Sequence, residues 1–586
     1  MPRLGARIVV TGRGEGIAPA AYPPPIDTQG EFVRRELDVD ADRVDVGVAI
    51  VGGGTAGLAT ANRLLQLLDD DPALAESLGE VPVAVIEKAA ACGGHGLSGA
   101  VMRPEPLLEL FPDAGREDWR AAGFAFGEVR KEAVYLLPTA KRAVRVPVPP
   151  PFRNHGNEVV SVAALGRFQQ QRAEEAGAYV LTETAASQLL VADGVVRGVR
   201  SGDKGRGRDG EPLANFEPGT DIAARVTVLA EGCWGHLTGA AIREFGLGEG
   251  REPQVWELGV KEVWRVARPL DRVIHTLGPW PLRLSARYGQ IGGSWIYPMR
   301  DAEGNDLVSI GFVLDLDYAD ATTSAHDLLQ LFKTHPLVRG ILEGGERVAW
   351  GAKALPGGGY WSMPKLTMPG ALIVGDAAGM VDTVALKGLH HSIRSGMLAA
   401  EAIYAALRDD GDLASYERAV EESSIGRELW QVRNARQPLQ RGLLRGAPLV
   451  QAMIATKGRF PGRRRPWRRD DETAMFVGST KDRYPSPDGS YVFDKLSSVY
   501  VSGNATRDDA PSHIRVQRRV PRAVAETWRW MCPAGVYEID EDGASESGEV
   551  DLIVNAANCV QCGAITAKGG RLTVPEGGAG PRYRVT

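Results

Sequence analysis

Glycines at a fixed spacing near the start of the chain predict a site for the phosphates of a nucleotide. Residues 52–57 read GGGTAG, with an apolar run before them and a helical pattern after them. In the G-x-G-x-x-G pattern the first glycine allows a tight turn, the second lets the backbone approach a pyrophosphate, and the third lets helix and strand pack closely. An ordinary tight turn is the alternative for an isolated motif. The candidate cofactor residues here are Gly52, Gly53, Gly54, Thr55, Ala56 and Gly57.

An acidic residue at the end of the next predicted strand supports a nucleotide site. Residues 83–86 read VAVI and predict a strand that ends at Glu87 and Lys88. A carboxylate at this place can accept hydrogen bonds from ribose hydroxyls. The spacing from Gly57 exceeds the usual ~20 residues. We interpret the polar segment 69–82 as an insertion that accounts for the difference.

Two further segments are expected at the same edge of a parallel sheet. Residues 92–100 (CGGHGLSGA) directly follow the second strand, where open α/β folds bind ligands; a flexible loop is the alternative. Residues 371–374 predict a strand that runs into Gly375 and Asp376, and a helix is predicted over 388–407. Such an aspartate can bind flavin ribityl hydroxyls while the helix start faces a phosphate. A helix-capping aspartate is the alternative.

Together these motifs favour a flavin over a nicotinamide. A glycine pattern near the start and a strand–Gly-Asp element roughly 300 residues later resemble the FAD-binding fold of glutathione-reductase-like and hydroxylase-like flavoproteins. We therefore expect an α/β, Rossmann-like FAD-binding domain formed by 44–253 and 361–440. Residues 254–360 are rich in strand-like runs and predict a β-rich domain inserted into it.

The cysteines and the composition narrow the class of protein. Five cysteines in 586 residues exclude a disulfide scaffold, and the grouping of Cys532, Cys559 and Cys562 near the C-terminus indicates metal or redox chemistry in a reducing compartment. A net charge of −6 gives no reason to expect nucleic acid as a partner. No apolar run approaches the ~20 residues of a membrane-spanning helix, and the first residues show no secretory signal. The length predicts two to four domains, and residues 1–43 are interpreted as an N-terminal surface extension.

Several longer strings resemble the electron transfer flavoprotein–ubiquinone oxidoreductase family, also called electron-transferring-flavoprotein dehydrogenases. They are GVKEVWRV (259–266), GQIGGSWIYPM (289–299), LEGGERVAWGAKALPGGGYWSMPKL (342–366), ALKGLHHSIRSGMLAAEAI (385–403), CPAGVYE (532–538), NCVQC (558–562) and PEGGAGPRY (575–583). The resemblance covers nearly everything from Val44 onward. It implies FAD, an iron–sulfur cluster in a C-terminal ferredoxin-like domain (471–586), and a quinone pocket in the inserted domain.

The resemblance also implies roles for individual residues. Gly52, Gly54, Gly57, Glu87 and Asp376 would hold FAD, and the loop at 95–100 would lie near the isoalloxazine ring. Gly292 and Gly293 match positions that line the quinone pocket, where missing side chains would let a flat ring approach the backbone; a hairpin turn is the alternative. The other cofactor candidates in these segments are Lys88, His95, Leu97, Ser98, Gly99, Gly375 and Gly388.

The C-terminal cysteines depart from the family pattern. That pattern continues from CPAGVY to C-x-x-C-x-x-C and supplies four thiolates, but here Ile565 stands at the fourth position after Cys532, Cys559 and Cys562. A complete cubane normally uses four thiolates. The three cysteines could hold a [3Fe-4S] cluster, or a [4Fe-4S] cluster completed by water or the neighbouring Thr566, or no cluster.

Residues 441–470 are the candidate for membrane contact. A short apolar segment is followed by RRRPWRR at 463–469, a combination that suits a lipid–water interface. A buried helix with a solvated basic loop is the alternative. The family resemblance favours peripheral, monotopic attachment, at the cytoplasmic face of a bacterial inner membrane or at the mitochondrial inner membrane; without a recognisable transit peptide we prefer the first.

The function implied is electron transfer from reduced electron transfer flavoprotein, through FAD and a cluster, to a membrane quinone. His390 and His391 could carry protons to the quinone, or could only pack the helix. One alternative is an FAD-dependent reductase or hydroxylase of a lipid-like substrate. Another is the quinone-facing flavin subunit of a larger electron-transfer complex.

Overall fold

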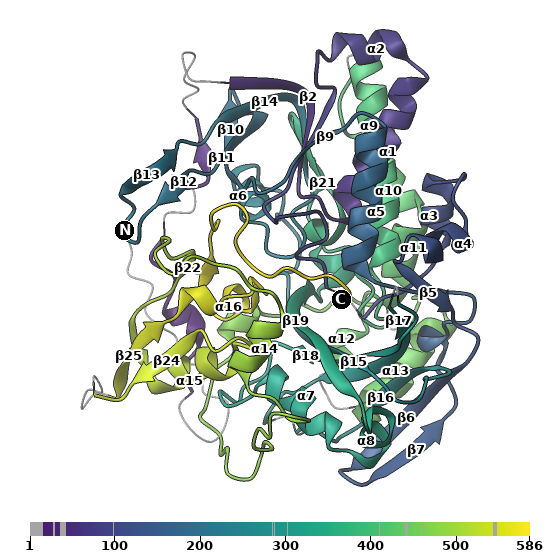
Figure 1. Ribbon diagram of the computed structural model, residues 1–586, viewed down its shortest axis with the longest axis vertical. Coiled ribbons are helices and arrows are strands. Elements are labelled where there is room, and N and C mark those ends of the chain that lie inside the picture. Colours follow the sequence, from purple (N-terminus) through teal and green to yellow (C-terminus); the bar gives the residue numbers. More distant parts are fainter. Residues whose placement is uncertain are drawn as a thin grey trace.

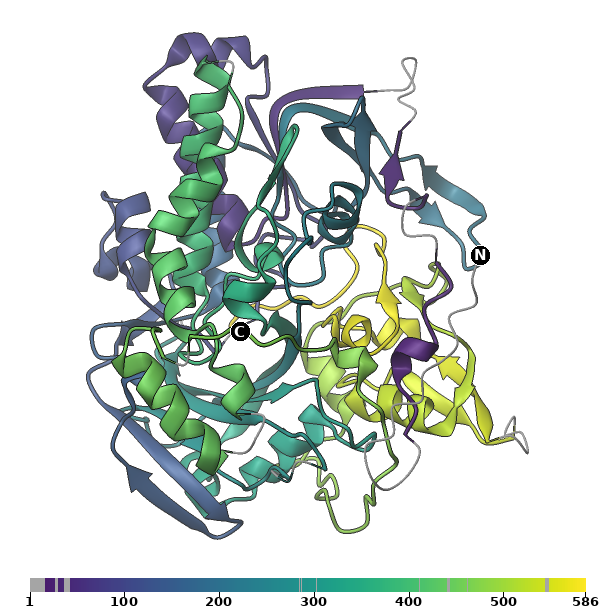
Figure 2. The ribbon, with the colours of Figure 1, turned by 180° about the vertical axis from the view of Figure 1, so that it is seen from behind.

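The computed structural model (Figure 1) describes residues 16–26, 30–35, 43–97, 99–283, 285, 287–301, 303–409, 411–439, 443–460, 462–542 and 548–586. Ser98, a cofactor candidate, lies outside the described residues. A mainly parallel sheet with long helices on one side occupies one half of the molecule. A largely antiparallel sheet and the C-terminal region occupy the other half (Figures 1 and 2).

The first sheet brings four strand ends to one edge. β2 (Arg43–Val51) lies between β3 (Val83–Ile86) and β14 (Asp221–Leu229), and β21 (Ala371–Ile373) pairs with β14; all of these pairings are parallel. Their apolar runs are continuous because both faces of the sheet are covered. The remaining strands are β1 (Val33–Arg34), β9 (Tyr179–Leu181), β10 (Ala186–Ala192), β11 (Val195–Ser201) and β20 (Thr367–Met368).

Long helices cover one face of this sheet. α1 (Thr55–Asp69) starts directly after the glycine motif and packs between α9 (Leu389–Asp409) and α5 (Val162–Glu175) (Figure 1). Small residues of α1 are buried, which allows α5 and α9 to approach this helix closely; they are Ala56, Gly57, Ala59 and Ala61. The helices that follow α9 are α10 (Ser415–Glu422), α11 (Ser424–Val432) and α12 (Arg436–Leu439).

The second sheet is built from more of the chain than the sequence predicted. Its order is β19-β15-β18-β17-β16-β6-β7, so 132–146, which we expected in the FAD-binding domain, completes it. Local patterns do not encode such pairing between distant segments. Helices α7 (Ala325–Lys333) and α8 (Pro336–Leu342) follow β18. The strands are β6 (Glu132–Thr139), β7 (Arg142–Val146), β15 (Trp256–Arg265), β16 (Val273–Leu277), β17 (Gly292–Arg300), β18 (Asp306–Asp315) and β19 (Glu346–Pro356).

The C-terminal region shares a hydrophobic core with the second sheet. Trp528 and Val520 belong to the same buried cluster as Trp264 and Phe312. The final segment, 573–586, runs back into the half of the molecule that contains the first sheet (Figure 1). There, Tyr583 N donates to Gly94 O at 2.9 Å. The elements are α14 (Lys495–Val501), β22 (Ile514–Arg515), β23 (Arg519–Pro521), α15 (Arg522–Met531), β24 (Tyr537–Asp540), β25 (Glu549–Val554), α16 (Ala564–Ala567) and β26 (Arg571–Leu572).

Part of the expected N-terminal surface extension is instead built into the fold. β1 pairs in parallel with β10, and Phe32 and Val33 are only 2% and 4% exposed. Ile17 forms a bridge with Met475. Phe32 and Val33 are buried although the sequence around them is rich in Gly, Pro and charge.

The candidate membrane segment forms α13 (Leu443–Ala455), and 456–460 and 462–469 after it are irregular. Residues 441, 442 and 461 of this segment lie outside the described residues. Val450 and Met453 of α13 are buried against Ala435. This side of the helix agrees with the alternative prediction, a buried helix. Phe460, just beyond the helix, is 54% exposed. Among the described residues, no helix combines the length and the apolar character that a membrane crossing requires.

Candidate functional site

A cavity of about 360 Å³ lies where the parallel strands of the first sheet end. Val51, Ile86, Ala230 and Val374, at the ends of β2, β3, β14 and β21, form its floor. Gly57 and Gly375 do not line it but adjoin residues that do. The candidate residues that the structure brings together on its wall are Gly52, Gly53, Gly54, Thr55, Ala56, Glu87, Lys88, His95, Leu97, Gly99, Asp376 and Gly388.

The three glycines of the motif meet different constraints. Gly52 has a φ of +110°, and a Cβ there would lie 2.3 Å from Ala230 O. A Cβ on Gly57 would lie 2.1 Å from Gly52 O, so helix α1 can approach the strand only without one. A Cβ on Gly54 would meet nothing within 4 Å. Gly54 therefore presents an open backbone face at the start of α1, as a bound pyrophosphate requires.

Glu87 and Lys88 place one negative and one positive group beside the glycine turn. The Glu87 carboxylate accepts hydrogen bonds from Gly53 N and Ala89 N, both at 2.7 Å, and these bonds fix its orientation. Burial lowers the pKa of Lys88 to about 8, with the nearby Lys353 ammonium adding to the effect. Because Lys353 also lines the cavity, two cations face the same space, and an anionic ligand would relieve their repulsion.

Asp376 also lines the cavity. It follows β21 in the short helical turn η4 (Gly375–Ala378), and Gly375 adopts a φ of +63° to make this bend. Burial raises the pKa of the Asp376 carboxyl, and Ser392 Oγ donates to Asp376 Oδ1 at 3.3 Å. Gly388 immediately precedes α9, so free N–H groups at the helix start lie close by.

The loop after β3 closes another side of the cavity. Burial, with the charges of Lys88 and Lys353, holds the pKa of His95 well below its usual value, so the imidazole is neutral. A Cβ on Gly99 would lie 2.6 Å from the Trp295 ring, so this loop packs directly on β17. Leu97 also lines the cavity.

Buried polar atoms without partners support a polar ligand in this cavity. Among the described residues, five residues of the wall each carry a buried nitrogen or oxygen with no hydrogen-bond partner. Leaving such groups unsatisfied is costly, so a ligand with several donors and acceptors fits here. The atoms are His95 Nδ1, Trp234 Nε1, His236 Nε2, His513 Nε2 and Gln561 Oε1.

Part of this wall was not predicted from the sequence. His513, Gln561 and 572–575 come from the C-terminal region, far from the nucleotide motifs in the chain. Trp234, which stacks on Trp256 with ring centroids 3.6 Å apart, follows β14. In the sequence, the only indication of these wall residues was the family resemblance of 558–562 and 575–583, and it did not predict that they lie beside the flavin site.

A second, smaller cavity of about 20 Å³ contains the three C-terminal cysteines. Cys532, Cys559 and Cys562 all line it and are buried. Val536 N donates to Cys532 Sγ and Gln561 N donates to Cys559 Sγ, each at 3.4 Å. Such N–H···S bonds stabilise the negative sulfur ligands of an iron–sulfur cluster. Burial raises the pKa of the Cys559 thiol to about 12, so occupation by metal would require loss of its proton.

The fourth corner of this cavity is apolar. Ile565, at the start of α16, lines it and is 4% exposed. The Thr566 hydroxyl, considered above as a substitute ligand, accepts a hydrogen bond from Leu572 N at 3.1 Å instead of lining the cavity. Cys233 donates to Ala354 O at 2.8 Å and lines the larger cavity, so it supplies no fourth thiol.

The two cavities have a wall in common. Gly563 and Leu572 line both of them. Gln561, between Cys559 and Cys562, lines the larger one, and a Cβ on Gly563 would lie 2.3 Å from the Trp234 ring. The chain around Gly563 therefore lies between the cavity of the thiols and the nucleotide-type site.

Gly292 and Gly293 line neither of these two cavities. They begin β17, paired with Leu314 and Val313 of β18, and so are not a hairpin turn. A Cβ on Gly292 would lie 2.2 Å from Val313 O, so its lack of a side chain already has a packing cause. Val313, directly opposite Gly293, does line the larger cavity.

Comparison with known proteins decides the family. One family model, described as ETF-QO, ubiquinone-binding, matches residues 256–355, and another, described as electron transfer flavoprotein-ubiquinone oxidoreductase, 4Fe-4S, matches 489–584. The mitochondrial electron transfer flavoprotein-ubiquinone oxidoreductase of Caenorhabditis elegans is 36% identical over 579 residues, covering 94% of this chain and 93% of that protein. The chain belongs to the electron transfer flavoprotein–ubiquinone oxidoreductase family.

A bacterial relative extends the same match. The probable electron transfer flavoprotein-ubiquinone oxidoreductase of Acinetobacter baylyi is 34% identical, covering 93% of this chain and 99% of that one. Among solved structures, a geranylgeranyl bacteriochlorophyll reductase-like protein of Thermoplasma acidophilum has a TM-score of 0.51 at 18% identity, covering 71% of this chain and 92% of that one. That likeness concerns the fold alone.

The matched segments of the electron transfer flavoprotein–ubiquinone oxidoreductase models correspond to distinct parts of the structure. The ubiquinone-binding model covers β15 to β19, and the 4Fe-4S model covers the region that holds the three cysteines. The expected fold class is confirmed: a Rossmann-like FAD-binding fold with an inserted β-rich part and a C-terminal ferredoxin-like part.

Proposed function

We propose that the protein oxidises reduced electron transfer flavoprotein and reduces a membrane quinone, using FAD in the larger cavity and an iron–sulfur cluster in the smaller one. Family membership supports the reaction. The main structural support for electron transfer between the two cofactors is that Gly563 and Leu572 line both cavities. Bound side by side, FAD and the cluster would supply the one- and two-electron chemistry that side chains lack.

FAD would be held by backbone groups together with a few side chains. In this proposal Gly54 and the start of α1 face the pyrophosphate. The Glu87 carboxylate accepts hydrogen bonds from the ribose hydroxyls, and the Asp376 carboxylate accepts them from the ribityl hydroxyls. The open space at Gly54 and the unpartnered polar atoms of the wall support this assignment. His95 and Gly99 would border the ring system. Because these groups are already fixed by hydrogen bonds and packing, they would bind FAD with little rearrangement.

The cluster would be held by three thiolates. Cys532, Cys559 and Cys562 line one small buried cavity, and two of them already accept N–H···S hydrogen bonds. We propose that the corner occupied by Ile565 carries no protein ligand. The cluster is then either [3Fe-4S], or [4Fe-4S] with water on one iron, and the iron content distinguishes the two.

Quinone and membrane would approach from the half of the molecule that contains the second sheet. We propose that Gly292 and Gly293 border the quinone pocket, supported by the ubiquinone-binding match over 256–355 and by Val313 in the wall of the larger cavity. Peripheral contact with the cytoplasmic face of a bacterial membrane is proposed for α13 and the basic run after it. The exposed Phe460 and Arg463 suit that role.

The test is anaerobic turnover with reduced electron transfer flavoprotein and a soluble quinone analogue. We expect oxidation of the flavoprotein in proportion to quinone reduced. Cys559→Ser is expected to lose iron and slow turnover, whereas His155→Gln, on an exposed loop, should change neither. Oxidation of NAD(P)H without any oxidation of electron transfer flavoprotein would contradict the proposal and favour a reductase or hydroxylase.

A further inference from the structure

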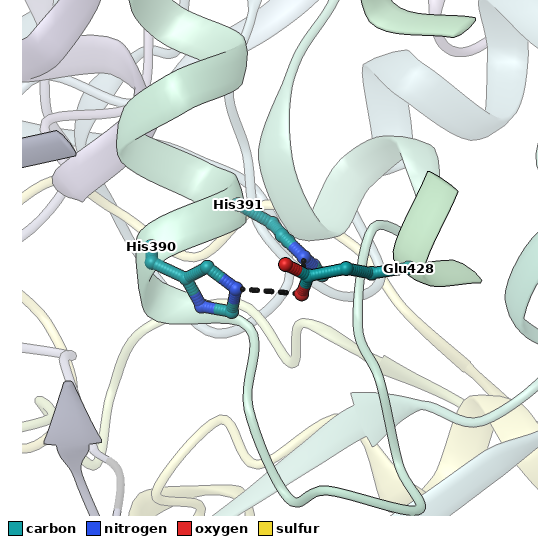
Figure 3. A group of neighbouring side chains, drawn as sticks. All are labelled: His390, His391 and Glu428. Atoms are coloured by element: carbon teal, nitrogen blue, oxygen red, sulfur yellow. Dashed lines mark hydrogen bonds and ion pairs between the residues drawn. The ribbon is translucent and has the colours of Figure 1, made fainter. Parts of the chain in front are cut away.

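Two histidines and a glutamate converge outside both cavities. His390 and His391 lie in the first turn of α9, and Glu428 reaches them from α11 (Figure 3). Glu428 Oε2 lies 3.1 Å from His390 Nε2 and 3.0 Å from His391 Nε2. His391 is completely buried and His390 is 4% exposed. Taking one such atom from each residue, the three atoms lie within 4.8 Å of one another.

The contacts of His391 suit a bound cation. Its Nδ1 lies 3.2 Å from Met380 O, and its Nε2 faces the Glu428 carboxylate. Both partners only accept hydrogen bonds, and a neutral imidazole carries a single N–H. When Nδ1–H donates to Met380 O, the Nε2 lone pair faces the Glu428 carboxylate, and a positive ion between them would interact with both.

We propose that His390, His391 and Glu428 form a binding site for a divalent transition-metal ion of the zinc type. The Nε2 atoms of both rings and Oε2 of the carboxylate are the three protein ligands, and the fourth position is open to water. Two imidazoles and one carboxylate are a ligand set that zinc accepts, with bonds of about 2.0–2.2 Å. Nothing in the proposed electron transfer uses these three side chains.

The surroundings hold the ligands in the necessary orientation. Arg103 Nη1 donates to Glu428 Oε1, which leaves Oε2 directed at the histidines. The Met380 carbonyl accepts from Nδ1 of His391, which fixes the tautomer with a free Nε2 lone pair. Such outer contacts are typical of metal-ligating carboxylates and histidines.

Two basic groups and three carboxyl groups, Glu428 included, surround the proposed site. Arg103 and Lys387 supply positive charge close to Glu428, and Asp382 and Asp376 supply negative charge close to His391. A divalent ion bound by one carboxylate therefore does not create an isolated buried charge. It would tie the start of α9, where Leu389 and Ser392 line the larger cavity, to α11.

The test is zinc binding by the full-length protein, loaded with FAD and its cluster and carrying no histidine tag. After dialysis in micromolar zinc, we expect about one zinc per chain. X-ray absorption at the zinc edge should show nitrogen or oxygen neighbours at about 2.0–2.1 Å and no sulfur at about 2.3 Å. The sulfur distance is diagnostic because the cysteines are the competing ligands.

Variants separate this site from other histidines. His391→Gln and Glu428→Gln should each weaken zinc binding at least tenfold, whereas the exposed His155→Gln should bind as the wild type does. Absence of zinc from the wild type, a sulfur-containing shell, or equal retention by His391→Gln would overturn the proposal. The absorption experiment needs only the wild type, so a variant that fails to fold still leaves the proposal testable.

Discussion

The larger cavity and the cysteine cavity share a wall, but backbone atoms shape the first and side chains shape the second. The larger one depends on backbone: Gly52 and Gly57 lack a Cβ because neighbouring carbonyl oxygens occupy that space, and Gly54 leaves an open face. The smaller one depends on side chains, namely three thiols and the apolar Ile565. The first site therefore tolerates little change in shape, whereas the second can change its chemistry by one substitution.

The largest effect is expected from Gly57→Ala. The new Cβ would lie 2.1 Å from Gly52 O and 3.1 Å from Ala230 Cβ, both in the packed core. Overpacking typically costs about 1 to 3 kcal/mol and occasionally more, and a contact of 2.1 Å with a backbone oxygen places this change at the upper end. We expect little folded protein and no bound FAD, measured by the thermal midpoint and flavin absorbance. A normal midpoint with normal flavin content would refute the close-packing argument.

Gly54→Ala is the matched control and should affect the ligand alone. A Cβ here meets no protein atom within 4 Å, and φ of −83° suits any residue. The apoprotein should keep its thermal midpoint, but FAD should bind roughly 10- to 100-fold more weakly, about 1.4 to 2.7 kcal/mol. Titration of apoprotein with FAD measures this. Unchanged affinity would show that the pyrophosphate lies elsewhere.

Ile565→Cys should change the chemistry of the smaller cavity without changing the larger one. A thiol at this corner would provide the fourth thiolate of a cubane. We expect about four irons per chain and slower loss of iron to a ferrous chelator, with FAD content unchanged. Ile565→Val, which stays apolar, is the control and should match the wild type. Equal iron loss from both variants would argue against a ligand position here.

The smallest effect is a pH dependence of FAD binding through Lys88. Its pKa is lowered to about 8 by burial, so the ammonium that attracts the pyrophosphate is lost as pH rises through that value. FAD affinity should fall a few-fold between pH 7 and 9 in the wild type. In Lys88→Met it should be weaker at pH 7 and nearly flat.

The lowered pKa of Lys88 makes the stability of the apoprotein rise with pH, whereas it makes the affinity for FAD fall. Between pH 8 and 10.5 the unfolded chain binds a proton that the folded chain has lost, so stability should rise with pH in that window. The thermal midpoint of apoprotein measured at several pH values checks this. A wild type and a Lys88→Met variant with parallel profiles would contradict the role of Lys88.

Local sequence patterns were sufficient for several elements. The strand predicted at 83–86 is β3, and the helix predicted at 388–407 is α9 with small shifts at its ends. Continuous apolar runs and glycine positions report burial and backbone shape, which depend on neighbours along the chain. The same reasoning recovered the glycine turn and Glu87, because each follows directly from the strand before it.

The sequence by itself determined the nucleotide motif, the strands at 83–86 and 371–374, and three cysteines with an isoleucine at the fourth position. Only the tertiary structure decided that 132–146 completes the second sheet, that Gln561 and 572–575 wall the larger cavity, and that Glu428 meets His390 and His391. The physical reason is that these contacts join segments far apart in the chain. Their pairing depends on how whole elements pack, and no local pattern encodes it.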